Sequence, residues 1–130
     1  MKNYPRDVPI LIVLAFCALM VHGYHPGVED AEIYLPGIKK ALNPALYPHN
    51  SAFFASHARM TLFPSLIAGS IRISNLPVDW ALFLWQWFSI FLLLLGCWHL
   101  GRLTFRDALA RWGSVALIAA LLTSTSWTST

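Results

Sequence analysis

Three long stretches of this chain contain no aspartate, glutamate, lysine or arginine. They run from Val8 to Val28, from Trp80 to Gly101 and from Trp112 to Thr130, and they hold 21, 22 and 19 residues. An α-helix that crosses a membrane needs about 20 predominantly apolar residues. Only 12% of the 130 residues are charged and 57% are hydrophobic, whereas a soluble domain carries about 25% charged residues. The sequence therefore predicts an all-α, polytopic membrane protein.

A fourth apolar stretch, from Met60 to Ile71, has only 12 residues. It crosses a bilayer only if the next residue, Arg72, extends its side chain to the far headgroups, so the sequence leaves open whether this stretch spans or is re-entrant. The segment 23–59 is too short to bury a core of its own. We predict a single membrane domain over residues 1–130, with about four transmembrane helices near residues 8–24, 60–73, 80–101 and 112–127.

Basic residues ahead of the first stretch set the expected orientation. Lys2 and Arg6 precede it, so the positive-inside rule keeps the N-terminus in the cytoplasm and places the loop 23–59 outside. A cleaved signal peptide is the alternative, although the residues around Gly23 match a cleavage site only loosely. The arginines of residues 102–111 face the cytoplasm if the fourth stretch is re-entrant, and face outside if it spans.

Residues 29–43 predict a kinked juxtamembrane helix on the outer surface. Tyr34, Ile38 and Leu42 share one side of a helical wheel, and most of the charged residues lie elsewhere. Pro36 should bend or break the helix, because proline removes a backbone donor and clashes with the preceding turn. We expect the three apolar side chains to point toward lipid.

Several classes of function are excluded by composition. The net charge of +3 arises from nine basic residues scattered singly or in pairs, without the basic stripe of a nucleic-acid surface. Cys17 and Cys97 lie in apolar runs without a CxxC motif, and no two histidines before residue 60 have the i, i+4 spacing of a helical metal motif. The sequence therefore predicts no nucleic-acid partner and no metal site of its own, and the lipid bilayer is the expected partner.

An acidic cluster follows the first apolar stretch. Glu29, Asp30 and Glu32 are the only acidic residues between Asp7 and Asp79. Clustered carboxylates repel one another, which favours a role as general base or metal ligand. The alternative interpretation is a solvated start of a helix, where acids complement the positive N-terminal end of the helix dipole.

The order of these features resembles the N-terminal part of the GT-C-fold polytopic membrane glycosyltransferases, which include protein O-mannosyltransferases and the aminoarabinose transferases of lipid A. Members of that family often carry Asp-Glu-x-x-Tyr soon after the first helix. Matching the tyrosine to Tyr34 places the family's catalytic aspartate on Asp30, with Ala31 where the glutamate is expected. Glu29 or Glu32 would then supply the second acid. Many bacterial membrane proteins of unassigned activity share this layout.

The resemblance implies transfer of a sugar from a polyprenyl-phosphate donor in the bacterial inner (plasma) membrane. Asp30, with Glu29 beside it, would act as base on the acceptor or help to bind a divalent metal. Tyr34, His57 and Arg59 are candidates for substrate binding, because a cationic side chain neutralises a lipid phosphate well. Contact with lipid headgroups is the alternative role for the basic residues.

The end of the chain bears on whether this is an enzyme. Residues 123–130 are mostly serine and threonine where an apolar helix should continue, which is typical of an interrupted protein. We therefore expect an N-terminal fragment of a glycosyltransferase, inactive by itself. The alternative is a complete, small, non-enzymatic membrane protein that acts as a partner subunit, and the reading frame beyond Thr130 distinguishes the two.

Overall fold

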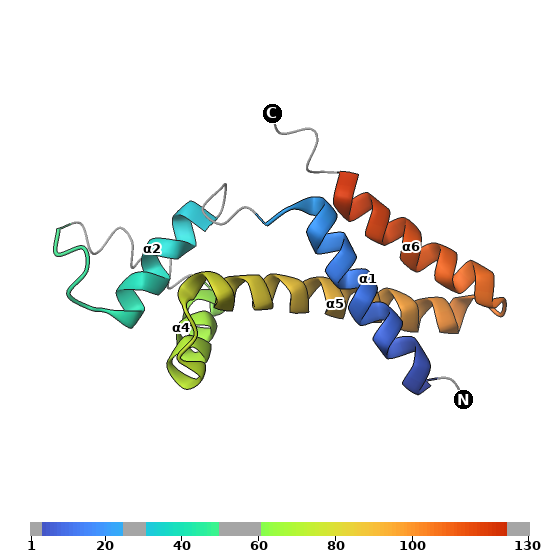
Figure 1. Ribbon diagram of the computed structural model, residues 1–130, viewed down its shortest axis with the longest axis horizontal. Helices are drawn as coiled ribbons and strands as arrows, with labels where there is room; N and C mark the ends of the chain where they lie inside the picture. The colour runs from blue at the N-terminus through green and yellow to red at the C-terminus, as the bar shows by residue number, and fades with distance from the viewer. Residues whose placement is uncertain (1–3, 25–30, 50–60, 125–130) are drawn as a thin grey trace. The chain divides into compact units, whose positions relative to one another are not determined.

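The computed structural model describes residues 4–24, 31–49 and 61–124, and this part of the chain is helical without any β-strand (Figure 1). The all-α class predicted from the sequence is confirmed for these residues. The helices are α1 (Tyr4–His22), α2 (Ala31–Leu42), α4 (Phe63–Ser74), α5 (Val78–Thr104) and α6 (Ala108–Ser124).

Helix lengths bear on the predicted number of membrane crossings. Within the described residues, α5 is the one helix that is long and apolar enough to cross a membrane. The apolar part of α6, Ala108–Thr123, is shorter, and the 12 residues of α4 span about 18 Å against roughly 30 Å of hydrocarbon. The structure thus supports one crossing where the sequence predicts about four, and the multi-pass arrangement stays a prediction.

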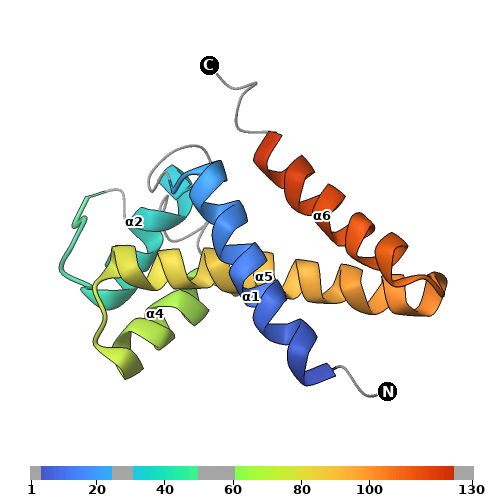
Figure 2. The same cartoon turned by 45° about the vertical axis from the view of Figure 1, so that its right-hand side comes forward.

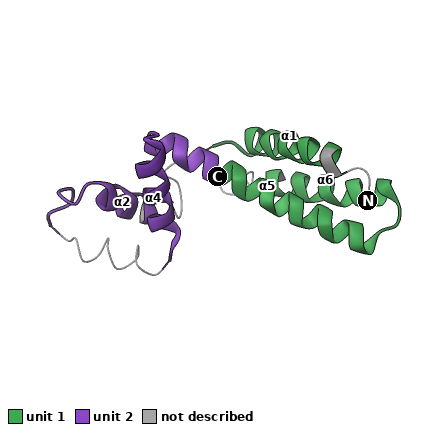
Figure 3. Ribbon diagram, turned by 90° about the horizontal axis from the view of Figure 1, so that it is seen from below, with its two compact units in different colours: residues 1–24, 86–130 green, residues 25–85 purple. Residues whose placement is uncertain are grey.

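The chain divides into two compact units, shown in Figure 3. Unit 1 comprises residues 1–24 and 86–130 and holds α1, α6 and most of α5. Unit 2 comprises residues 25–85 and holds α2, α4 and the first turns of α5. Each unit has its own small hydrophobic core. The prediction of a single membrane domain stays a prediction.

The core of unit 1 is formed by three helices. Its buried members are Leu11, Ala15, Leu94, Trp98, Val115 and Ala119. Each helix contributes two of them, four residues apart, which places both on the same helix face. α1 and α6 pack against each other (Figures 1 and 2). Trp98, only 2% exposed, is the largest buried side chain.

The outward surface of unit 1 is also apolar. Val13 and Val21 on α1, Leu100 on α5 and Leu117 on α6 are each more than 60% exposed. Among the described residues, no polar or charged side chain is buried. A helix on the surface of a soluble protein carries polar residues on its outer face, whereas a helix that is hydrophobic on all sides requires apolar surroundings on all sides. Large apolar side chains are therefore exposed on all three helices of unit 1.

Unit 2 is built on the pairing of α2 with α4. Ile38 of α2 is 1% exposed and packs with Ile67 and Ile71 of α4 and Ala81 of α5. The prediction that Ile38 and its neighbours on the same face point toward lipid is therefore wrong. The physical reason is that Ile67 and Ile71, four residues apart, form a matching apolar stripe on α4.

α2 also continues through Pro36, so of the predicted bend or break at this residue, the break does not occur. A proline in a helix interior costs about 3 kcal/mol, because one backbone hydrogen bond is lost and the ring clashes with the preceding turn. Complete burial of an isoleucine contributes roughly 1.5–3 kcal/mol. The burial of Ile38, two residues later, therefore offsets much of this cost and keeps the helix intact.

Left-handed residues end two of the helices. Gly23 has φ 83° and donates its backbone N–H to the carbonyl of Leu19 at 3.0 Å, which ends α1. Asn75 has φ 54° and donates its N–H to the carbonyl of Ile71 at 2.8 Å, which ends α4. Glycine and asparagine adopt this conformation most readily. The end of α1 at His22 fixes where the connection that carries Glu29 and Asp30 begins.

The first prediction concerns the core of unit 1. Trp98→Ala should lower the free energy of unfolding by about 3–5 kcal/mol, because it leaves a cavity between three helices. Trp80→Ala removes an indole that is 61% exposed and should change the stability by less than about 0.5 kcal/mol. Denaturant unfolding of the full chain in detergent, followed by circular dichroism, measures both. Equal losses in the two variants would contradict the assigned core.

Candidate functional site

The structure describes one of the five residues predicted to form the site. Tyr34 lies in α2 and is half-buried. Glu29, Asp30, His57 and Arg59 lie outside the described residues, and their roles stay predictions. Since Ala31 is the first residue of α2, the acidic pair directly precedes this helix along the chain.

Tyr34 packs against the beginning of α4. Its ring meets that of Phe63 edge to face, with ring centroids 6.0 Å apart and an interplanar angle of 74°. Aromatic pairs in this geometry contribute about 0.5–1.5 kcal/mol beyond the area they bury. Ile38, one turn further along α2, lies in the core of unit 2. The tyrosine is therefore held by a packed helix face.

The other end of the helix pair is joined by Arg72. Its Nη2 donates a hydrogen bond to the backbone carbonyl of Ala41, in the last turn of α2. The last carbonyls of a helix have no partner within the helix and carry partial negative charge, so a guanidinium is favourable there. Tyr34 contacts the start of α4 and Ala41 contacts its end, so the two helices run parallel.

The contact of Arg72 was not predicted from the sequence. A spanning helix would have required its guanidinium to reach the far headgroups, whereas the structure gives this group a backbone partner inside unit 2. The available signal was the spacing of apolar residues. Ile67 and Ile71 on α4 repeat at four residues, as Ile38 and Leu42 do on α2, and two such stripes indicate a helix pair.

The turn after α2 is closed by polar contacts. Lys40 donates from Nζ to the carbonyl oxygen of Tyr47 at 3.2 Å, and Asn43 Oδ1 accepts the backbone N–H of Ala45 at 3.1 Å. Tyr47 adopts a left-handed conformation with φ 54°. Lys40 is therefore engaged by its own loop, whereas Lys39 is exposed and presents its charge to the surroundings.

A hydrogen-bond chain joins α4 to the start of α5. Trp85 Nε1 donates to Ser70 Oγ at 3.0 Å, and Ser70 Oγ donates to the carbonyl of Ile67 at 2.8 Å. The indole N–H is therefore satisfied inside unit 2. These two hydrogen bonds connect the first turns of α5 to the middle of α4.

Metal binding is not supported by the part of the chain that the structure describes. Within residues 4–24, 31–49 and 61–124, no three histidine, cysteine, aspartate or glutamate side chains are grouped as a metal ion would need. The predicted divalent-metal role belongs to Glu29 and Asp30, which lie outside these ranges. Of the elements around those acids in the chain, the structure describes α2, which begins at the next residue, Ala31.

The described part of the site is thus a parallel helix pair, α2 and α4. The first of these helices, α2, directly follows the acidic pair in the chain. It positions an aromatic side chain, Tyr34, by edge-to-face packing on Phe63, one turn before the buried Ile38. No family model, no curated protein and no solved structure matches this chain.

Proposed function

We propose that this chain is an integral membrane protein whose unit 1 is embedded in lipid. The observation that carries the proposal is the apolar outward surface of α1, α5 and α6. Exposed apolar area costs about 25 cal/mol per Å² in water, and lipid removes that cost. Trp80 near the start of α5 is 61% exposed, which suits an indole at the membrane interface.

The proposal includes several crossings in a bacterial inner membrane. α5 has 27 residues, about 40 Å, and fits a bilayer of roughly 30 Å when it is tilted. α1 has 19 residues and α6 has 17, about 28 and 25 Å, which approach the same thickness. Three crossings by these helices fit the lengths better than four, since α4 spans about 18 Å.

Within this membrane protein we propose a glycosyl-transfer role for the acidic pair before α2. The support is the order of elements that the resemblance to GT-C enzymes requires. An apolar helix, α1, is followed in the chain by Glu29 and Asp30 and then by the amphipathic α2 with Tyr34. Asp30 would accept the proton of the acceptor hydroxyl as that oxygen attacks the anomeric carbon and the lipid phosphate leaves.

The other residues of this proposal have supporting roles. Glu29 supplies the second acid, and a divalent metal bound beside the two carboxylates would neutralise the leaving phosphate. Tyr34, His57 and Arg59 contact the polyprenyl-phosphate-linked sugar. A partner subunit without catalytic activity is the second candidate function, and it is favoured by the exposed apolar side chains of unit 1, which suit another membrane helix as well as lipid.

The orientation is the first prediction of this proposal. Single cysteines at positions 2 and 51, in a background lacking Cys17 and Cys97, are treated with a membrane-impermeant maleimide. Position 51 should react in intact cells, and position 2 should react only after permeabilisation. The reason is that the basic residues at the start of the chain, Lys2 and Arg6, stay in the cytoplasm. The variant without cysteines gives the background. Reaction at position 2 but not at 51 in intact cells would overturn the orientation.

The activity is tested by Asp30→Asn, which keeps the size of the side chain and removes its charge. Transfer of sugar from a polyprenyl-phosphate donor, measured in membranes that contain the full-length protein, should fall at least about a hundredfold, the low end for loss of a general base. Expression and membrane insertion should not change.

Glu29→Gln is the informative comparison in that assay. Loss of transfer in Glu29→Gln alone would move the catalytic role one residue upstream. Full activity in both variants would contradict a transfer that depends on these acids, and the absence of any transfer beyond that of membranes without the protein would favour the partner-subunit function.

A further inference from the structure

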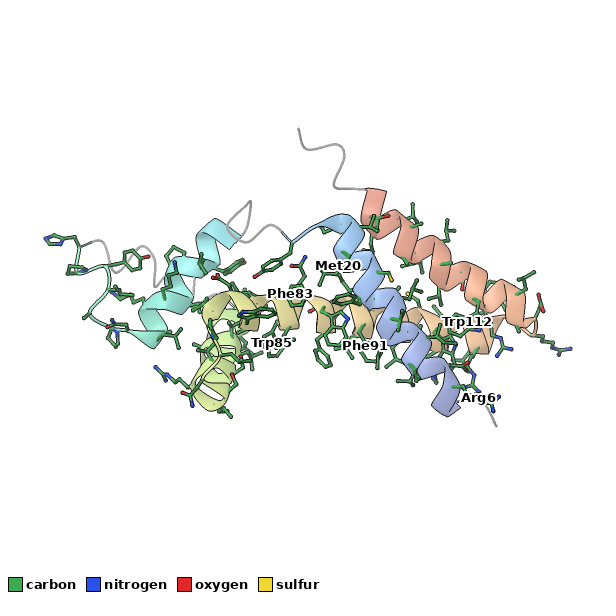
Figure 4. The ribbon with its side chains drawn as sticks, in the orientation of Figure 1. Arg6, Met20, Phe83, Trp85, Phe91 and Trp112 are labelled. Carbon is green, nitrogen blue, oxygen red and sulfur yellow. The ribbon has the colours of Figure 1, made fainter. Side chains whose placement is uncertain are left out.

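Four arginines gather at one end of unit 1. α1 begins at the same end of the unit as the connection between α5 and α6, in all three ribbon views (Figures 1, 2 and 3). Figure 4 shows Arg6 and Trp112 at this end. The arginines come from the first turn of α1, the last turn of α5, the connection and the first turn of α6. They are Arg6, Arg102, Arg106 and Arg111.

The acidic residues at this end are already used by the helix starts. Asp7 lies in the first turn of α1, where a carboxylate complements the helix dipole. Asp107 precedes α6 and accepts the backbone N–H of Ala110 at 3.3 Å, as a capping side chain does. This end of unit 1 carries four guanidinium groups and two carboxylates among the described residues. Its net charge is therefore positive, next to the apolar sides of the helices.

The four arginines differ in their exposure to the surroundings. Arg6 and Arg106 are exposed. The guanidinium of Arg102 lies over the ring of Trp98, 4.8 Å from its centroid, and Arg111 Nε donates to the backbone carbonyl of Asp107 at 3.3 Å. These contacts fix two of the side chains at the rim of the core, where the apolar surface of unit 1 ends.

We propose that this basic end binds the phosphate headgroups of anionic lipids in one leaflet. The inference rests on the proposed embedding of unit 1 and adds the partner and the site. Guanidinium groups pair with phosphate through two parallel hydrogen bonds. A cluster of basic residues at the end of membrane helices gains electrostatic attraction from an anionic leaflet.

The proposal also determines which ends share a side of the membrane. The N-terminus of α1 and the connection between α5 and α6 lie against the same anionic leaflet, so α1 and α5 cross in opposite directions. The positive-inside rule puts the basic N-terminus in the cytoplasm, so the arginines of residues 102–111 on the same side are also cytoplasmic. With α1 and α5 each crossing once, α4 does not cross. The sequence alone leaves open whether the stretch from Met60 to Ile71 spans or is re-entrant, and the proposal selects the arrangement in which it does not span.

The test measures lipid preference by tryptophan quenching. The full chain is reconstituted in phosphatidylcholine bilayers, to which phosphatidylglycerol or phosphatidylcholine with brominated acyl chains is added. Brominated phosphatidylglycerol should quench the tryptophan fluorescence at a concentration at least about fivefold lower than brominated phosphatidylcholine does. Added salt should reduce this difference. Arg106→Gln should weaken this preference about twofold, and Arg6→Gln with Arg106→Gln should weaken it further.

Lys39→Gln is the matched control, because it removes one exposed positive charge from unit 2 and should leave the preference unchanged. Equal quenching by the two lipids, or an equal effect of Lys39→Gln and Arg106→Gln, would overturn the proposed site. Loss of the preference in inorganic phosphate, but not in chloride of the same ionic strength, would assign the arginines to free phosphate and would also overturn it. Absence of quenching by either lipid would overturn both this inference and the proposed embedding.

Discussion

The constraint on which the rest of the structure depends is that the helices of unit 1 are apolar on their outer as well as their inner sides. In lipid, apolar side chains gain little by moving from the surroundings into the core, so helix association depends on close packing and small residues. Unit 1 has these features. Ala15 and Ala119 lie in its core, and a Cβ added at Gly101 would lie 3.4 Å from Ser114 Oγ, which indicates a close approach of α5 and α6.

The two units differ in what holds them together. Unit 1 is held by the packing of Leu, Ala, Val and Trp side chains between three helices, with its arginines at one end. Unit 2 adds polar contacts to a smaller core: Arg72 to Ala41, Lys40 to Tyr47 and Trp85 to Ser70. Of the proposed site residues, Tyr34 lies in this helix pair.

The sequence predicted the helices well and their partners poorly. The charge-free stretch from Trp80 to Gly101 corresponds to α5 within three residues at either end, because nothing within it ends a helix. The sequence also predicts the apolar stripe of α2. Such a stripe can pack against lipid or against a neighbouring helix, and the sequence of α2 does not distinguish the two. Pro36 does not break α2, because the burial of Ile38 offsets much of a local penalty of about 3 kcal/mol. The roles of Glu29 and Asp30 depend on a motif in the sequence, and the described residues add only the position of Tyr34.

The measurement that tests the central claim most directly is the environment of the outward apolar side chains. Nitroxide labels at Val13, Phe88 and Leu117, each exposed on a different helix of unit 1, are compared in bilayers with a label at Ala45 in the turn after α2. The account predicts that dissolved oxygen relaxes the three labels more strongly than a water-soluble nickel complex does, with the reverse at Ala45. Access of the nickel complex to all four positions alike would contradict a unit 1 embedded in lipid.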